Sequence, residues 1–259
     1  MTDITKTAIT MVLDRSGSMN VCRKATIDAV NKYLAEARSS EQLTDADFEL
    51  MIFDSQSIDT IRSGPMTNVA DIGDADFQPR AMTPLWDACG RGIGSLDKKV
   101  GPNAENGKAV LVIVTDGEEN HSMKHTASSI RELIEARQNA GWLIIFLGAG
   151  LDNAVQAKSV GINVENVANI GLDEAALSAT MDAMVETNVA YASTRSFEEA
   201  KAYAASPKFS RSMRMAMGDA SGGDALRAAN PIKTPVVPLV KDTGDAWGGS
   251  ASSGDAWTK

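Results

Sequence analysis

The chain has 259 residues, of which 43% are hydrophobic, and its 25 basic and 34 acidic side chains give a net charge of −9. This excess of acidic residues argues against nucleic acid or an anionic membrane as the main partner. No apolar run approaches the ~20 residues of a membrane-spanning helix, and the run near the N-terminus is too short for a signal peptide, so we expect a cytoplasmic protein.

Strands and helices alternate along residues 1–205. The hydrophobic runs at 7–13, 108–116 and 142–150 are typical of strands buried on both faces of a sheet. The full set of predicted elements comprises strands at 7–13, 48–54, 57–63, 108–116, 142–150 and 164–168, and helices at 22–38, 84–97, 126–140, 152–160, 173–193 and 197–205. This order predicts an α/β domain with a doubly wound, Rossmann-like, mostly parallel sheet and helices on both faces.

Residues 206–259 differ in composition from the rest of the chain. They are rich in Gly, Ser, Ala and Pro and show little periodicity, which predicts a largely disordered, flexible tail with short helices near 209–217 and 224–229. The first of these helices would carry Arg211, Met213, Arg214, Met215 and Met217, a set that suits either a small docking helix or a disordered segment.

The tail contains the tetrapeptide Gly-Asp-Ala-Trp twice, at 244–247 and 254–257. One interpretation is a low-complexity duplication. The other is a pair of docking motifs in which Trp247 and Trp257 act as aromatic anchors, either for a partner or for self-association.

Two of the predicted strands end in aspartate, the first at Asp14 and the strongest at Asp116. Ligand sites of doubly wound sheets lie beyond the carboxyl ends of the strands, where the strand order reverses. With the strand order 3-2-1-4-5-6, these two carboxylates become neighbours at that point. They would repel each other unless a cation lay between them.

Three hydroxyl groups accompany the two carboxylates. Ser16 and Ser18 follow Asp14 in the same loop, where Gly17 allows a tight turn, and Thr83 stands at a helix start. Five oxygens of this kind suit a hard cation such as Mg²⁺, and no thiolate or imidazole is needed. The alternatives are that the three hydroxyls cap helices and that Asp116 forms only a turn.

Three separated segments carry a resemblance to a known family. "DRSGSM" at 14–19, "MTPLWDA" at 82–88 and "VTDGEEN" at 114–120 resemble, in the same order, the motifs of a von Willebrand factor type A domain with a metal-ion-dependent adhesion site. The resemblance extends over about residues 5–195. The sequences of the motifs are most similar to those of intracellular bacterial or phage versions of the domain.

The resemblance implies roles for these residues. Ser16, Ser18 and Thr83 would be direct ligands of Mg²⁺, with Mn²⁺ and Ca²⁺ as alternatives. Asp14 and Asp116 would act largely through waters or hydrogen bonds. One coordination position would stay open for an Asp or Glu carboxylate of a protein partner. One departure from the family pattern is Ala81, two residues before Thr83, where relatives often have glycine.

The function predicted is therefore a metal-dependent protein-binding module and not an enzyme. By resemblance, the partner is associated with an ATPase or with a phage or stress-related assembly. The alternative is a Mg²⁺-assisted hydrolase or phosphatase. However, an aspartyl-phosphate phosphatase needs a second Asp where Ser16 stands, and the P-loop and G-x-S-x-G motifs do not occur.

Other polar residues lie beside the predicted site. We expect Arg15 to be a solvated loop residue or to pair with the incoming carboxylate. Glu118 and Glu119 would form an acidic rim beside the metal, and His121 and His125 would be surface residues. Cys22 and Cys89 fit a reducing compartment and form no zinc pattern.

Overall fold

The structure is a computed structural model that describes residues 6–150, 153–224 and 228. A six-stranded sheet in the order β3-β2-β1-β4-β5-β6 forms its centre, and all neighbouring strands are parallel except the antiparallel pair β2 and β3. The strands are β1 (Thr7–Asp14), β2 (Asp47–Phe53), β3 (Ile58–Pro65), β4 (Lys108–Thr115), β5 (Leu143–Gly148) and β6 (Val167–Asn169). The predicted fold class and strand order are confirmed.

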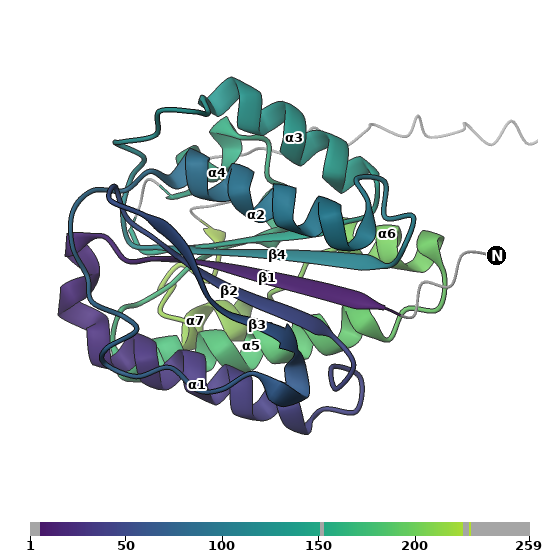
Figure 1. The fold of residues 1–259 in the computed structure, drawn as a ribbon, viewed down its shortest axis with the longest axis horizontal. Coiled ribbons are helices and arrows are strands. Elements are labelled where there is room, and N and C mark those ends of the chain that lie inside the picture. Colours follow the sequence, from purple (N-terminus) through teal and green to yellow (C-terminus); the bar gives the residue numbers. More distant parts are fainter. Residues whose placement is uncertain (1–5, 151–152, 225–227, 229–259) are drawn as a thin grey trace, which may run out of the picture.

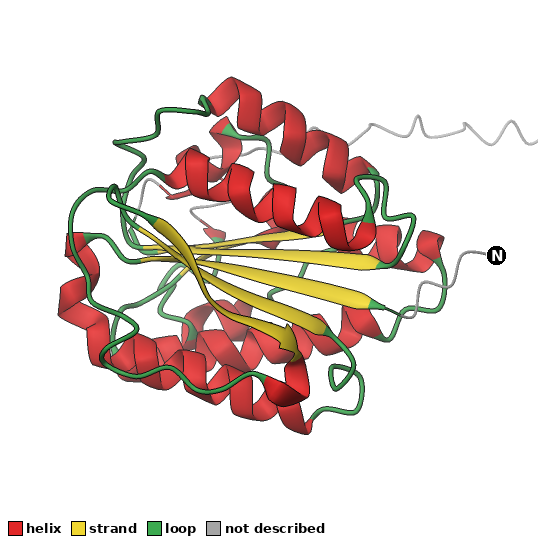
Figure 2. Ribbon diagram, viewed as in Figure 1, coloured by secondary structure: helices red, strands yellow, loops and turns green. Residues whose placement is uncertain are grey.

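Helices cover both faces of the sheet (Figures 1 and 2). The helices are α1 (Arg23–Ser39), α2 (Leu85–Val100), α3 (Ala127–Asn139), α4 (Asn153–Ser159), α5 (Glu174–Ala192), α6 (Phe197–Ala205) and α7 (Arg211–Ala216), with single 3₁₀ segments η1 (Gly17–Cys22), η2 (Met66–Asn68) and η3 (Val164–Asn166). In Figure 1, α2, α3 and α4 lie above the sheet, and α1, α5 and α7 lie below it. Among the described residues, no helix is both long and apolar enough to cross a membrane.

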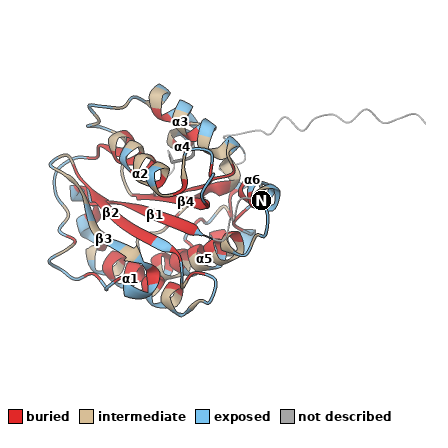
Figure 3. Cartoon of the chain, turned by 45° about the vertical axis from the view of Figure 1, so that its right-hand side comes forward, coloured by how far each residue is buried: buried red, intermediate tan, exposed pale blue. Residues whose placement is uncertain are grey.

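The sheet separates two hydrophobic clusters, which explains the apolar runs in the sequence. β1, β4 and β5 are buried along their whole length, because alternate side chains point to opposite faces and both faces are covered. Figure 3 shows the buried strands between helices whose outer faces are exposed. Cys22 and Cys89 are both buried and free, and they lie in different clusters.

Residues 206–224 fold back onto the domain, so the predicted start of a flexible tail at residue 206 is wrong for this stretch. Phe209 and Met217 are buried in the hydrophobic cluster that also contains residues of α1 and α5. Arg214 of α7 is also buried, and its guanidinium donates to the backbone oxygen of Val167 in β6 at 2.6 Å. These anchors hold the segment in place, whereas its Gly-rich and Ser-rich composition suggests disorder. The repeats at 244–247 and 254–257 lie outside the described residues.

Candidate metal centre

The carboxyl ends of β1 and β4 bring the two predicted aspartates together. In the parallel register Leu13 lies beside Val114, so Asp14 lies next to Thr115 and Asp116 follows directly. The Thr115 hydroxyl donates a hydrogen bond of 2.6 Å to Asp14 Oδ2. The predicted pairing of the two strand ends is therefore present.

The loop after β1 points two hydroxyls at the same place. Ser18 Oγ donates to Asp116 Oδ1 at 2.7 Å, and Ser16 Oγ lies 3.0 Å from Ser18 Oγ. The Ser16 N–H donates to Asp14 Oδ1 at 2.6 Å. Although Ser16 occupies the N-cap position of η1, its side chain makes no capping hydrogen bond. The two serine hydroxyls are thus directed toward the aspartates, as the metal-site interpretation requires.

The third hydroxyl comes from the loop before α2. A Cβ placed on Gly117 would lie 3.1 Å from Thr83 Oγ1 and 3.7 Å from Asp14 Oδ2, so the Thr83 hydroxyl and the Asp14 carboxylate both border Gly117. The N–H of Thr83 donates to Asn120 Oδ1 at 2.8 Å, and the N–H of Asn120 donates back to Thr83 O at 3.1 Å. The structure therefore brings all five predicted site residues to one edge of the sheet.

The two carboxylates lie in surroundings that disfavour their charge. Asp14 is fully buried, and this burial raises its pKa from 3.8 to about 6 despite the hydrogen bonds from Thr115 and Ser16. Burial also raises the pKa of Asp116. Within the described residues, no Lys or Arg forms an ion pair with either group. Asp14 is buried and Asp116 is partly buried, and ionising both without a nearby positive charge is costly.

The donor set fits a hard divalent cation. It offers two carboxylates and three hydroxyls, all oxygen, which is the ligand type that Mg²⁺, Mn²⁺ and Ca²⁺ prefer. In the described part of the chain, the candidate centre included, no group of three or more His, Cys, Asp or Glu side chains is arranged to hold a metal. The candidate centre depends on its hydroxyls to complete the ligand set.

Arg15 does not have either of the roles expected from the sequence. Its side chain is buried and turns away from the candidate centre toward β2 and β3. There it pairs with Asp54 at 2.6 Å and with Asp59 at 3.2 Å, and Arg80 joins the same Asp54 carboxylate at 3.0 Å. The neighbouring acid Asp54 was not identified from the sequence, so this internal ion pair was missed.

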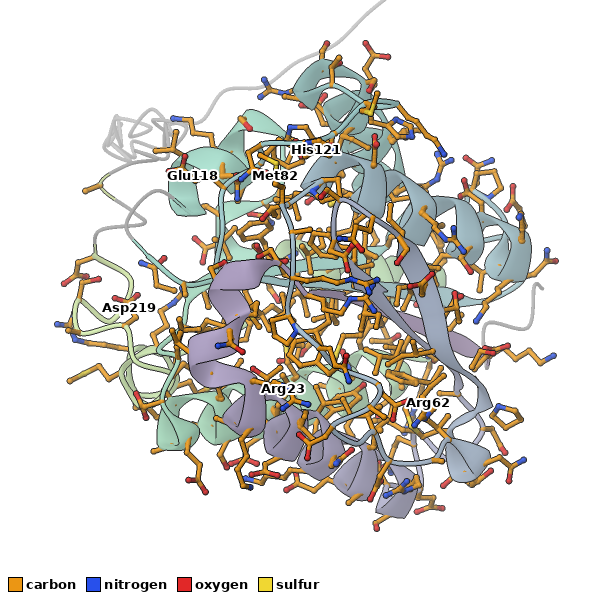
Figure 4. The ribbon with its side chains drawn as sticks, turned by 60° about the vertical axis from the view of Figure 1, so that its left-hand side comes forward. Arg23, Arg62, Met82, Glu118, His121 and Asp219 are labelled. Atoms are coloured by element: carbon orange, nitrogen blue, oxygen red, sulfur yellow. The ribbon has the colours of Figure 1, made fainter. Side chains whose placement is uncertain are left out.

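The prediction that Glu119 forms part of an acidic rim beside the metal is also wrong. Its carboxylate accepts hydrogen bonds from the backbone of Trp86, His121 and Ser122 and from the Ser122 hydroxyl. It therefore fastens the loop after β4 to the first turn of α2. Glu118 is exposed beside the centre, and Figure 4 shows it near Met82 and His121 on the edge that faces the viewer.

The two histidines have different surroundings. His121 is exposed, as predicted. His125 is half-buried, and its ring packs so closely against α2 that a Cβ on Gly90 would clash with His125 Nε2. Neither position supports a zinc pair.

Three residues that support the centre were missed from the sequence. Thr115 holds Asp14, and Asn120 holds Thr83. Gln156 of α4 accepts from Glu119 N at 2.7 Å and donates to Gly117 O at 3.2 Å. Thr115 and Asn120 lie within the "VTDGEEN" motif, so their place in the sequence could have indicated a role at the centre. Nothing near Gln156 in the sequence marks its role.

Ala81 adopts the left-handed backbone conformation, with φ of 59°. This conformation is unfavourable for a residue with a Cβ, and it occurs two residues before Thr83, at the position where the sequence departs from the pattern that it resembles. The loop is fixed on both sides: Gly17 N donates to Ala81 O at 3.1 Å, and Ser55 N donates to Met82 O at 2.9 Å. Thr83 is thus presented by a strained and well-anchored loop.

The fold and the site together define an α/β domain with an oxygen-lined acidic site at the switch point of its sheet. No known protein-family profile matches the sequence, and no curated protein matches it. Among solved structures, the chain is similar to the pilus adhesin SpaC from Lactobacillus rhamnosus GG in its open conformation, with 12% identity and a TM-score of 0.57. This match covers 71% of the present chain and 30% of SpaC.

Two further likenesses have lower scores. Proximal thread matrix protein 1 from the mussel byssus, solved with a zinc-occupied MIDAS motif, is 16% identical with a TM-score of 0.48 over 70% of this chain and 47% of its own. The SpRpn10 VWA domain is 12% identical with a TM-score of 0.46 over 68% of this chain and 94% of its own. At such identities the SpaC match shows a shared fold alone, and the lower-scoring pair adds nothing to it.

Proposed function

We propose that this protein is a von Willebrand factor type A module that binds a divalent metal ion at Asp14, Ser16, Ser18, Thr83 and Asp116. Mg²⁺ is the first candidate, with Mn²⁺ and Ca²⁺ as alternatives. One observation carries the proposal: among the described residues, the buried Asp14 and the partly buried Asp116 lack a cationic partner, and the hydroxyls of Ser16, Ser18 and Thr83 lie beside them at the same strand ends.

We further propose that the bound metal captures a protein partner through an Asp or Glu carboxylate. The ion would supply positive charge and an open coordination position. The chain's own groups hold the ligands in place: Thr115 orients Asp14 and Asn120 orients Thr83. Because these groups are held before binding, little ordering cost would remain for the partner to meet.

A Mg²⁺-assisted hydrolase is the weaker candidate because Glu118, the exposed carboxylate beside the centre, makes no hydrogen bond to another described residue that would orient it as a general base. The chain has two histidines; His121 is exposed, and His125 packs on α2. The Glu119 carboxylate already accepts four hydrogen bonds. A base must reach the attacking group and be able to take its proton, so binding is favoured over hydrolysis.

The proposed setting is the cytoplasm of a bacterium or of a cell infected by a phage. The residues of the three motifs, which resemble intracellular bacterial or phage versions of the domain, support it. The proposed partners are components of ATPase-linked, stress-related or phage-related assemblies, because intracellular proteins with similar motifs work there. A partner captured as described below would be identified by mass spectrometry, which tests this setting directly.

The test is affinity capture from native lysate with the full chain, in excess Mg²⁺ and in excess EDTA. We expect a partner that is retained only in Mg²⁺ and is lost with Asp14→Asn. Thr83→Ala should weaken capture by about 1.5–3 kcal/mol, the value of one charge-assisted contact. Thr67→Ala, at an exposed threonine in η2, is the matched control. A partner retained equally in EDTA would rule out the mechanism, and turnover in a phosphatase screen would favour the hydrolase.

A further inference from the structure

Large exposed apolar side chains lie on the same edge of the sheet as the candidate metal centre. Among the described residues, five large hydrophobic side chains are strongly exposed, with values from 46% to 86%. Four of them belong to the loops and helix starts at the carboxyl edge of the sheet, and we call these four the apolar rim: Val21, Met82, Met123 and Val155. Apolar groups that cluster on an otherwise polar surface mark an interaction site more often than chance exposure does.

Two rim residues are direct neighbours of predicted metal ligands. Val21 lies three residues after Ser18 in the 3₁₀ segment η1, where residues i and i+3 share a face at a rise of about 2 Å per residue. Met82 directly precedes Thr83, with Cα atoms about 3.8 Å apart. Figure 4 shows Met82 beside Glu118 and His121 on this edge.

The other two rim residues belong to the loop that follows Asp116 and to α4. Val155 is adjacent to Gln156, whose side chain bonds to Gly117 and Glu119. Met123 lies in the loop between β4 and α3, and its N–H donates to Asp87 in the first turn of α2 at 2.9 Å. The centre is therefore polar in the middle and apolar at its border. A matching ligand has a carboxylate with a large apolar side chain close by.

The chain itself carries this pattern in Gly-Asp-Ala-Trp, at 244–247 and at 254–257. In an extended segment, residues i and i+2 point to the same side, so the aspartate and the tryptophan would face the domain together, about 6–7 Å apart. This separation matches the distance of about 6 Å from Ser18 to Val21 along η1. The two exposed methionines suit tryptophan in particular, since thioether sulfur makes favourable contacts with aromatic rings.

The last described residues of the chain lie near the same edge of the sheet as the candidate metal centre. Residues 218–221 line a pocket together with Gly150 and Asn169, which lie at or just beyond the carboxyl ends of β5 and β6. Figure 4 shows Asp219 on the same edge as Met82. Between Asp224, the last residue of the continuous described chain, and Asp245 there are 21 residue steps, which reach up to ~70 Å when extended. A domain of this size is only about 45 Å across.

We propose that the Gly-Asp-Ala-Trp segments are internal ligands of this chain's own metal centre. Asp245 or Asp255 completes the metal coordination, and Trp247 or Trp257 packs on the apolar rim. This inference rests on the proposed metal site and names its first occupant. Two copies on one linker double the local concentration of the ligand, so an external partner must compete with them.

Quenching of tryptophan fluorescence by acrylamide tests the proposal in the full chain. The chain has four tryptophans, and Trp86 and Trp142 are buried, so the quencher-accessible emission reports on the other two. We expect Mg²⁺ to lower the quenching constant of this emission at least twofold relative to EDTA. In the double variant Asp245→Asn, Asp255→Asn the protection should disappear, and calorimetry should show Mg²⁺ binding that persists with several-fold lower affinity.

The controls separate the inference from the function on which it rests. Asp242→Asn, two residues before the first motif, should behave as wild type, and Val21→Ser with Met82→Ser should lose protection while keeping Mg²⁺ binding. Equal protection and equal Mg²⁺ affinity in wild type and the double variant would overturn the internal ligand and leave the metal site intact. Protection that grows with protein concentration would overturn the within-chain arrangement. Absence of Mg²⁺ binding by wild type would overturn the proposed function itself, together with this inference.

Discussion

Two buried aspartates end neighbouring strands of this domain, and their charges are treated in opposite ways. Asp14 ends β1, and Asp54 directly follows Phe53, which pairs with Asp14 in the register. Both are almost fully buried. Burial raises the pKa of Asp14 to about 6. Burial acts in the same direction on Asp54, but backbone hydrogen bonds from Gln56 and the arginines Arg80 and Arg15 outweigh it and lower the pKa.

The difference separates an acid that is neutralised inside the fold from one that is not. Asp54 has its counter-charge inside the fold, because Arg15 and Arg80 both contact its carboxylate. Asp14 has only neutral donors, Ser16 N–H and the Thr115 hydroxyl. A buried acid with arginine partners holds the structure together. A buried acid without them is left for an external cation, and perturbed pKa values of this kind are concentrated at functional sites.

The same substitution at the two aspartates should therefore act with opposite sign. Asp54→Asn leaves the buried Arg15 without its main counter-charge and should lower the free energy of unfolding by about 3 kcal/mol. Asp14→Asn removes a desolvated charge and should raise it in EDTA at pH 7.5. The hydrogen bonds can be kept, since the amide can accept from Ser16 N–H and donate to Thr115 Oγ1. Denaturant unfolding of both variants measures the two values, and destabilisation by both substitutions would contradict the comparison.

Stability should depend on pH in opposite directions at the two aspartates. For Asp14 the pKa in the folded chain, about 6, lies above the ordinary 3.8, so its contribution is full below pH 3.8 and is lost as the pH rises through 6. For Asp54 the lowered pKa gives a contribution that is lost as the pH falls. In EDTA, wild type should lose up to about 2–3 kcal/mol relative to Asp14→Asn between pH 4 and 7.5.

Excess Mg²⁺ should remove this pH-dependent loss, because the ion stabilises the ionised Asp14 carboxylate and binds the folded chain alone. Unfolding curves at pH 4, 6 and 7.5, with EDTA or Mg²⁺, provide the measurement. A wild-type stability that follows Asp14→Asn at every pH in EDTA would show that the Asp14 pKa is not raised.

Loss of the Thr83 hydroxyl should have a smaller effect, confined to the metal. Thr83→Val keeps the shape of the side chain and removes one proposed ligand, so Mg²⁺ affinity should fall about tenfold, equivalent to about 1.4 kcal/mol. Thr67→Val, at the exposed η2 position, serves as the control and should bind Mg²⁺ as wild type does. Unchanged Mg²⁺ affinity in Thr83→Val would exclude this hydroxyl from the ligand set.

The smallest predicted effect is on stability, and it compares backbone strain beside the candidate centre with backbone strain elsewhere in the domain. Ala81 and Ala104 are the two described non-glycine residues with positive φ, at 59° and 57°. Glycine at either position should raise stability by about 0.5–1 kcal/mol, because relief of the left-handed strain exceeds the entropy that glycine adds to the unfolded chain. Ala81→Gly should also weaken Mg²⁺ binding a few-fold, since the loop carrying Thr83 becomes less fixed. Ala104→Gly should not change it, and equal Mg²⁺ affinities in the two variants would separate Ala81 from the site.

The fold and the placement of the five candidate ligands follow from local patterns in the sequence. The apolar runs ending at Asp14 and Asp116 predict buried parallel strands, and the chain topology brings their ends together. Because the motif residues lie at strand ends or directly before a helix, their positions are set by the elements themselves. Whether they bind a metal stays a prediction.

The partners of the polar side chains could not be predicted, since they depend on contacts between distant segments. Arg15 reaches Asp54 across 39 positions, and Glu119 bonds to Trp86 across 33. Nothing in the local sequence of these residues distinguishes them from solvated loop residues. The same holds for Arg214, whose contact with Val167 across 47 positions fixes a segment that its composition describes as disordered.

The most direct test of the account is an isothermal titration of the full chain with Mg²⁺, and then Mn²⁺, at pH 7.5, for wild type, Asp14→Asn and Asp59→Asn. Asp59 lies in β3 and pairs with Arg15 on the side away from the centre, so its variant controls for the loss of one carboxylate. The account predicts one saturable site in wild type and in Asp59→Asn and none in Asp14→Asn. Unchanged affinity in Asp14→Asn, or no binding by wild type, would contradict it.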